Sequence, residues 1–353
     1  MKTIWIVPIE PIDSRYTKQW YENIPKILER NITDNSLEFN VVTIDGTQSE
    51  TGTTAGAFLD FAVTNAYKAS QIENIAGLFQ AGKIKAGDKF LITDAWNFAV
   101  TAIRYMSELL DIPVEIHGIW HAGAYDPTDI LGMKMSKPWP WLQEKAWYHA
   151  IDHNYYATQF HRSMFLHNLD IHYQDTGKAH VSGQPHEPLV AQLKLHDSKP
   201  KLRTVIWPHR YNADKQPEIA EDLKNFMPVS ITSKMNLSKR DYYDMLGLSQ
   251  VIFSCALHEN LGISIMESVL AGGIPVLPKR CSYAEMYLDE FLYPSVWTDS
   301  YENYEKHKDE LIAFINDRLD NPDKYAEALA EQRKILIGKY LTCQPMINKL
   351  LDL

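Results

Sequence analysis

Short apolar runs alternate along the chain with longer segments in which apolar residues recur every three or four positions. The apolar runs predict buried strands and the periodic segments predict amphipathic helices. In the first half, the predicted strands are 4–9, 39–44, 89–93, 114–119 and 155–159, and the predicted helices are 16–30, 57–79 with a break near residue 71, 98–110, 141–149 and 161–168. This alternation predicts an α/β domain, a doubly wound parallel sheet of five or six strands.

The periodicity fades between residues 175 and 200, where glycines and prolines interrupt it, and we interpret this stretch as a crossing between domains. A second alternating series follows, with predicted strands 204–207, 228–232, 251–255 and 274–277 and predicted helices 217–225, 239–246 and 263–270. Helical patterns at 301–319, 322–341 and 344–353 close the chain. We therefore expect domains at 1–180 and 181–335, and a C-terminal segment at 336–353.

Composition narrows the class of protein without identifying it. The 353 residues are enough for two domains with full cores, and 45% of them are apolar. No apolar run approaches the ~20 residues of a membrane-spanning helix, so we expect no stable membrane insertion. The first residues are too quickly polar for a signal peptide, and three cysteines without metal-ligand spacing suit a reducing compartment. We expect a cytoplasmic protein, of a bacterium or a phage-infected host.

The net charge of −10 argues against a protein that coats nucleic acid nonspecifically, but allows a local basic groove.

Residues 250–286 carry the most informative pattern. A predicted strand ends in a polar break, a predicted helix starts at Gly262, and the sequence AGGIPV at 271–276 stops the helix and begins the next strand. Glu259 falls at the carboxyl end of the first strand, and Glu267 falls about one turn into the helix. Ligands of open α/β sheets bind at this edge, and carboxylates accept hydrogen bonds from sugar and ribose hydroxyls.

The pattern resembles the donor-sugar signature of retaining GT-B glycosyltransferases, which pairs two glutamates with seven residues between them. The resemblance implies two Rossmann-like doubly wound domains facing a cleft, with a C-terminal helix that crosses back to the first domain. It also implies that Glu259 holds hydroxyls of the donor sugar, that Glu267 holds the nucleotide ribose, and that Asn260, Leu261 and Gly262 belong to the donor site. The family usually has Gly-Phe-Gly where this chain has Asn-Leu-Gly. The alternative is an ordinary α/β unit that carries two glutamates by chance.

A second constellation follows the predicted strand 204–207. In GT-B glycosyltransferases an arginine and a lysine five residues apart grip the donor diphosphate at this place, and Arg210 and Lys215 fit that spacing. Fixed cations there would stabilise the negative charge that grows on the leaving diphosphate. The alternative is a solvated loop with two cations.

The segment 203–287 is also similar to glycosyltransferases that mannosylate queuosine in tRNA, in its Pro-His-Arg and Asp-Lys motifs at 208–215 and in Leu-Pro-Lys-Arg at 277–280. Enzymes that glycosylate hydroxymethylated bases of phage DNA also adopt GT-B. Nucleic acid is therefore the expected acceptor, through a hydroxyl on a modified base of DNA or tRNA. A cell-surface or lipid-linked glycan is the alternative acceptor. The alternative to an enzyme is a protein that binds a sugar nucleotide without catalysing transfer.

The first domain offers candidates for contact with the reacting groups. Retaining GT-B enzymes often place a histidine after a strand such as 114–119, facing the donor sugar, and His121 is the first candidate and His117 the second. The alternative for His121 is a packing histidine. With Arg210, Lys215 and Glu259, His121 completes the expected catalytic set.

Four residues are candidates for the acceptor. Arg15 lies in the first strand-to-helix loop, and Asp94 follows the strand 89–93, where capping of the next helix is the favoured alternative. Trp139 and Trp141 alternate with lysines and prolines in the loop 132–141. Tryptophans stack on bases or on sugar rings, or they pack on the domain.

The expected substrate is a UDP- or GDP-linked sugar, with no separate cofactor. The chain contains no Asp-x-Asp pair, which the metal-dependent glycosyltransferases of another architecture use to bind manganese. We therefore expect no metal ligands in the donor site, and, from the resemblance, retention of the anomeric configuration.

Overall fold

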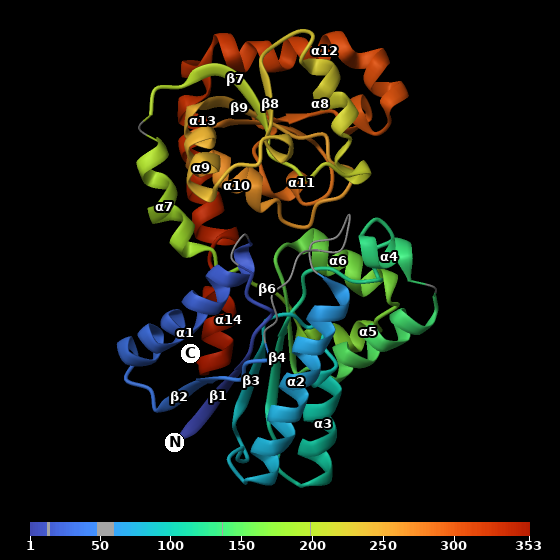
Figure 1. The fold of residues 1–353 in the computed structure, drawn as a ribbon, viewed down its shortest axis with the longest axis vertical. Coiled ribbons are helices and arrows are strands. Elements are labelled where there is room, and N and C mark those ends of the chain that lie inside the picture. The colour runs from blue at the N-terminus through green and yellow to red at the C-terminus, as the bar shows by residue number, and fades with distance from the viewer. Residues whose placement is uncertain (13–14, 48–59, 136, 198) are drawn as a thin grey trace. The chain divides into compact units, whose positions relative to one another are not determined.

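The computed structural model describes residues 1–12, 15–47, 60–135, 137–197 and 199–353 (Figure 1). The chain forms two compact units. Unit 1 consists of Met1–Ala157, His161–Pro185 and Cys343–Leu353, and unit 2 consists of Thr158–Phe160 and His186–Thr342. The sequence placed domain boundaries at residues 180 and 335, whereas unit 1 extends to Pro185 because the strand Ala179–Val181 still pairs with its sheet.

Unit 1 is built on a six-stranded parallel sheet with the order β2-β1-β3-β4-β5-β6. Its strands are β1 (Lys2–Val7), β2 (Phe39–Thr43), β3 (Lys89–Ile92), β4 (Glu115–Ile119), β5 (His153–Tyr156) and β6 (Ala179–Val181). Helices cover both faces of this sheet, so its central strands are almost continuously buried (Figure 1).

The helices of unit 1 form two groups. On one face lie α2 (Phe61–Gln80), α3 (Ala99–Leu109), α5 (Trp139–Ala150) and α6 (Gln159–Asn168, from His161 onward in this unit), and on the other lie α1 (Tyr16–Asp34) and α14 (Gln344–Leu351). The short helix α4 (Ile130–Lys134) follows β4. The expected break near residue 71 is wrong: helix α2 runs on through Gln71, whose buried side-chain amide donates to Pro8 O and Ile44 O at 2.9 and 3.2 Å. The expected start of this helix at residue 57 lies outside the described residues.

The last helix belongs to unit 1, and both chain ends lie there (Figure 1). Ile347 and Leu350 of α14 are fully buried in a cluster with Ile4 and Ile6 of β1 and Trp20 of α1. The expected return of the C-terminal helix to the first domain is therefore confirmed.

Unit 2 contains a five-stranded parallel sheet with the order β11-β10-β9-β7-β8. Its strands are β7 (Leu202–Trp207), β8 (Val229–Ile231), β9 (Ser249–Phe253), β10 (Ile274–Pro278) and β11 (Leu292–Tyr293). Its helices are α7 (Glu187–Asp197), α8 (Pro217–Leu223), α9 (Lys239–Leu248), α10 (Ile263–Leu270), α11 (Tyr283–Met286), α12 (Tyr301–Asp320) and α13 (Ala326–Ile335). The two doubly wound sheets are confirmed.

Both sheets share one topology. In each, the first strand of the unit lies between the second and the third, so the chain leaves the neighbouring strands β1 and β3, or β7 and β9, in opposite directions. This switch point is where open α/β sheets bind ligands, outside the carboxyl ends of the strands. The topology therefore marks one candidate edge in each unit.

Two further segments differ from the sequence-based expectation. The stretch 175–200 does contain the crossing from Pro185 to His186, but it also contains β6 and α7. Strand β6 has three residues, too few for a visible alternation, and only Leu189 and Leu193 of α7 are buried. The predicted helix 322–341 is divided into a 3-10 turn (Pro322–Tyr325), α13 and a π-helical turn (Leu336–Tyr340). None of the described helices is long and apolar enough to cross a bilayer.

The anchoring of α14 can be tested with two leucines of the same segment. Leu350→Ala removes a fully buried side chain, and we expect it to lower the free energy of unfolding by about 2–5 kcal/mol. Leu353 is 52% exposed, so Leu353→Ala should change that free energy by less than about 0.5 kcal/mol. Urea unfolding of both variants measures the difference. Equal effects would contradict the packing of α14 on the sheet.

Candidate functional site

The structure brings an acidic and a basic side chain together at the switch point of unit 2. Strands β7 and β9 are neighbours, and the loops after their carboxyl ends carry Lys215 and Glu259. Lys215 Nζ lies 3.4 Å from Glu259 Oε2. Two residues that are 44 positions apart in sequence therefore form an ion pair at the carboxyl ends of the strands of unit 2.

The surroundings of Lys215 keep this pair charged. Lys215 is only 5% exposed, and its Nζ also lies 3.2 Å from Asp214 Oδ2 and donates to His258 O. Burial alone would lower the pKa of Lys215, but Glu259 and Asp214 outweigh it and raise this pKa. Burial would likewise raise the pKa of Glu259, but Lys215, with smaller contributions from His209 and His258, lowers it. Both groups are therefore ionised at neutral pH.

Arg210 adds a second cation to this place. It is exposed, three residues beyond the end of β7. Its charge opposes the rise in the pKa of Lys215 and adds to the fall in the pKa of His209. The guanidinium therefore acts on the same site as Lys215. Two cations beside a carboxylate offer contacts for a phosphate group and for hydroxyl groups of one ligand.

Gly262 shapes the loop that holds Glu259. It adopts a left-handed conformation with φ 78° at the start of α10, and a Cβ there would lie 3.0 Å from Tyr283 Cε1 and 3.3 Å from Glu259 Cγ. Glycine is therefore required by both backbone and space. Among the described residues no side chain caps the start of α10, and an uncapped helix N-terminus favours negatively charged groups. Of the other two expected donor residues, Leu261 is buried and Asn260 is half-buried in the same loop.

Glu267 lies in different surroundings from Glu259. It is 9% exposed on α10, and its two carboxylate oxygens accept hydrogen bonds from the hydroxyls of Tyr242 and Tyr243 of α9, each at 3.2 Å. Burial raises the pKa of Glu267 to about 7, although Lys239 and the tyrosine hydroxyls oppose the shift. Its hydrogen-bond partners thus come from α9 and not from the loop of Lys215.

His209 is a residue of this site that the sequence analysis quoted without assigning it a role. Its Nε2 lies 2.8 Å from Ser254 Oγ, which ties the loop after β7 to the end of β9. Burial, and then the charge of Lys215, lower the pKa of His209 to about 3, so the ring is neutral. Tyr242 and Tyr243 were also missed, since nothing in the pattern of α9 distinguishes them from core aromatics.

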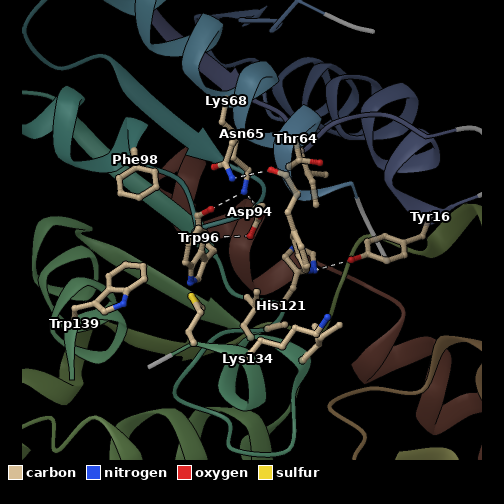
Figure 2. A pocket seen from close by; sticks show the side chains of 16 residues that line it. Tyr16, Thr64, Asn65, Lys68, Asp94, Trp96, Phe98, His121, Lys134 and Trp139 are labelled. Atoms are coloured by element: carbon tan, nitrogen blue, oxygen red, sulfur yellow. Dashed lines mark hydrogen bonds and ion pairs between the residues drawn. The ribbon is translucent and has the colours of Figure 1, made fainter. Parts of the chain in front are cut away.

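Unit 1 has a cavity of about 410 Å³ at its own switch point (Figure 2). Its walls come from segments that follow three strands: Ile9 after β1, Trp96 and Phe98 after β3, and His121 after β4. Helix α2 contributes Lys68 and Thr64, and the segment 130–139 contributes apolar side chains and Lys134. The cavity is therefore an aromatic and aliphatic chamber with a few polar groups in its wall.

Lys68 and Asp94 form the polar part of the wall (Figure 2). Lys68 Nζ lies 2.7 Å from Asp94 Oδ2 and donates to Trp96 O at 2.6 Å. Asp94 Oδ1 accepts from Trp96 N at 3.2 Å, while Asn97 Oδ1 accepts from Ala99 N at the start of α3. Capping of the helix by Asp94, the favoured alternative in the sequence, is therefore wrong, because Asp94 accepts from Trp96 N and the side chain that bonds the first N–H of α3 is Asn97.

His121 lies in the wall beside Tyr16. Its Nδ1 is 3.1 Å from the Tyr16 hydroxyl and its Nε2 is 2.7 Å from Thr93 O (Figure 2). Since a carbonyl only accepts, Nε2 carries the proton and Nδ1 accepts from Tyr16. Burial lowers the pKa of His121, with Asp94 opposing, so the ring is neutral. The second candidate, His117, is outside the lining and contacts Glu115 and Tyr155 instead.

Of the remaining acceptor candidates, one lines the cavity and two do not. Trp139 lines the cavity and is 50% exposed. Trp141 packs against the core and donates from Nε1 to Ala124 O at 2.6 Å, and Arg15, at the start of α1, is not part of the lining. The sequence analysis missed Lys68, Trp96 and Phe98. The two aromatic residues could have been found, since they directly follow Asp94 in the loop after β3.

Comparison with known proteins places this chain among GT-B folds. No family model matches it. It is similar to a curated tRNA-queuosine alpha-mannosyltransferase of Drosophila melanogaster, 26% identical over 128 residues, which cover 28% of this chain and 34% of that protein. The chain thus spans about a third of the length of the curated relative it matches.

Solved structures resemble nearly the whole chain. HepE of Anabaena, in complex with UDP and glucose, is 13% identical with a TM-score of 0.55, covering 100% of this chain and 98% of HepE. Sucrose-phosphate synthase of Thermosynechococcus elongatus is 11% identical with a TM-score of 0.60, covering 99% and 97%. At such identities the likeness shows the fold alone, and the GT-B fold expected from the sequence is confirmed.

The pKa of Glu267 predicts a pH dependence of stability. Because the folded state raises this pKa from 4.5 to about 7, the folded protein binds the proton more tightly, and its stability falls as pH rises through this window. Glu267→Gln cannot titrate. We therefore expect the unfolding free energy of the variant minus that of the wild type to increase between about pH 4.5 and 7 and to stay flat above. Urea unfolding at several pH values measures this difference, and a difference that does not change with pH would contradict the assignment.

Proposed function

We propose that this chain is a glycosyltransferase that takes its sugar from a UDP- or GDP-linked donor, and that unit 2 binds this donor. The observation that carries the proposal is the ion pair of Lys215 and Glu259 at the switch point, with Arg210 beside it. The uncapped start of α10 at Gly262 supports it, since a helix N-terminus favours phosphate groups.

The chemistry of transfer explains why cations are needed there. When the bond between the anomeric carbon and the phosphate breaks, negative charge grows on the diphosphate. Lys215 and Arg210 would stabilise this charge more in the transition state than in the bound donor, and this difference accelerates the reaction. Lys215 is already buried and fixed by three partners, so little reorganisation is needed. Glu259 would accept hydrogen bonds from the sugar hydroxyls, and Glu267 from the ribose.

The proposed reaction retains the anomeric configuration. The acceptor hydroxyl attacks from the side that the diphosphate leaves, and a phosphate oxygen of the leaving group takes the proton. This path requires no strong general base from the chain and no cofactor besides the donor. His121 stays a proposed sugar contact; its ring is neutral, and its Nδ1 accepts from the Tyr16 hydroxyl in the wall of the cavity.

For the acceptor, we propose a modified nucleic-acid base that carries a hydroxyl, in DNA or tRNA, bound in the cavity of unit 1. Flat aromatic side chains stack on bases without regard to their sequence, and Trp96, Phe98 and Trp139 line the cavity. The pair of Lys68 and Asp94 offers one donor and one acceptor for the edge of a base. The similarity to a tRNA-queuosine mannosyltransferase also favours a base.

The donor site is tested by removing its cations. Lys215→Met should lower kcat for transfer about 10²–10³-fold, because it removes charge stabilisation of the leaving diphosphate. Arg210→Met should lower kcat in the same direction, and since Arg210 is exposed, the variant should fold normally. The donor is first found by a thermal-shift screen of UDP- and GDP-linked sugars, because ligand binding raises the apparent stability.

Lys279→Met is the matched control for both variants, because Lys279 is an exposed lysine of unit 2 that pairs only with Asp289 among the described residues. Full activity in Arg210→Met and Lys215→Met would refute the donor site. Donor binding without hydrolysis or transfer on any acceptor would favour an idle binder.

The acceptor is tested with labelled donor sugar. We expect label in DNA with hydroxymethylated bases or in tRNA with modified bases, and none in an extract of cell-envelope glycan. Trp139→Ala should raise KM for the nucleic acid about 10-fold or more, since stacking contributes ~1–3 kcal/mol per base, without changing donor hydrolysis. Leu142→Ala, at another exposed apolar residue of α5, is the control. Label in envelope glycan alone would refute a nucleic-acid acceptor.

A further inference from the structure

A cluster of polar side chains occupies the opposite edge of the sheet of unit 1, at the amino ends of its strands. Glu115 and His117 lie on β4, His153 begins β5, and His180 lies on β6. The register pairs His117 with His153, and residues two apart on a strand point to the same face. Three neighbouring strands thus present these side chains to one place.

The ligand atoms of three of these residues already converge. One atom each of Glu115, His117 and His153 can be chosen so that all lie within 4.8 Å of one another. Glu115 Oε1 is 2.5 Å from His117 Nε2 and 3.9 Å from His153 Nε2. Ligands about 2.1 Å from a tetrahedral ion lie roughly 3.4 Å apart, so small side-chain rotations would suffice.

We propose that Glu115, His117 and His153 form a binding site for a divalent metal ion of the zinc type. Two imidazoles and one carboxylate are a donor set that suits zinc and its neighbours in the transition series. This site is separate from the proposed donor and acceptor sites, and it does not depend on the proposed function.

Partners of the two histidines would fix their orientation. His117 Nδ1 lies 2.8 Å from the Tyr155 hydroxyl, and His153 Nδ1 lies 3.2 Å from His180 Nε2. In both rings the Nδ1 atom is therefore held by a neighbour. Nε2 of His117 already shares a hydrogen bond with Glu115 Oε1, so a bound ion would replace that hydrogen bond, and the ring proton would move to Nδ1, which would then donate to the Tyr155 hydroxyl. Such second partners of ligating histidines set the tautomer and raise ligand basicity.

The ammonium group of Lys89 would compete with a metal ion for the carboxylate of Glu115. Its Nζ lies 3.2 Å from Glu115 Oε1 and 2.9 Å from Asp352 Oδ2. A bound ion would replace Lys89 as the partner of Glu115. Lys89 would keep its ion pair with Asp352. The side chains of Glu115 and His153 are 34% and 19% exposed, so an ion can enter from solvent. At the edge opposite the cavity, the ion would act by fastening β4 to β5.

The test uses the full chain, freed of metal with a chelator and titrated with Zn²⁺ alone by isothermal calorimetry. We expect one equivalent to bind and to raise the melting temperature. His153→Ala should weaken this binding at least about 100-fold. Lys89→Met should instead tighten it roughly tenfold, because it removes a nearby positive charge. A gain in affinity cannot come from misfolding.

The control is a double variant, His149→Ala with His172→Ala, which removes two exposed histidines of unit 1 outside the cluster and should bind Zn²⁺ like the wild type. Three outcomes would overturn the proposal: no saturable binding of one equivalent, equal affinity in His153→Ala and wild type, or a loss of binding in the control variant alone. Circular dichroism of each variant confirms that it is folded.

Discussion

The ion pair of the buried Lys215 and the half-buried Glu259 is the constraint on which the candidate donor site of unit 2 depends. Taking a lysine and a carboxylate out of water costs several kcal/mol for each ion, and their attraction only partly offsets this. Asp214 and His258 O complete the surroundings of Lys215, and Gly262 leaves room for Glu259. Such a pair is weak evidence for a contribution to stability. A charged group held in place at a ligand-binding edge is, however, what transfer from a diphosphate needs.

Both units place their polar groups at the same topological position but use different chemistry there. In unit 2 the strand ends carry ions, with Arg210 and Lys215 on one loop and Glu259 on the next. In unit 1 the same edge is lined mainly by aromatic and aliphatic side chains, with one ion pair, Lys68–Asp94, in the wall. An ionic site suits a phosphate ester, and an aromatic cavity suits a flat acceptor group.

Much of the fold follows from local signals that a sequence contains. Helix α10 was predicted with both of its ends, because Gly262 opens it in a left-handed conformation and Gly272, with φ 93°, ends it. Strands β9 and β10 are buried on both faces, so their apolar runs are unambiguous. The signals fail where an element is short, as in β6, or where few apolar residues mark a helix, as in α7.

The sequence alone determined the two doubly wound units, the return of α14, and the candidate residues Arg210, Lys215 and Glu259. The units follow from hydrophobic periodicity and the candidate residues from motifs within short segments, whereas the return of α14 follows from the resemblance to GT-B glycosyltransferases. Only the tertiary structure decided which side chains meet. It paired Lys68 with Asp94, placed Glu267 against tyrosines of α9, and gathered histidines from three strands at the far edge of the sheet. Contacts between distant segments follow from strand order and register, and no local pattern records these.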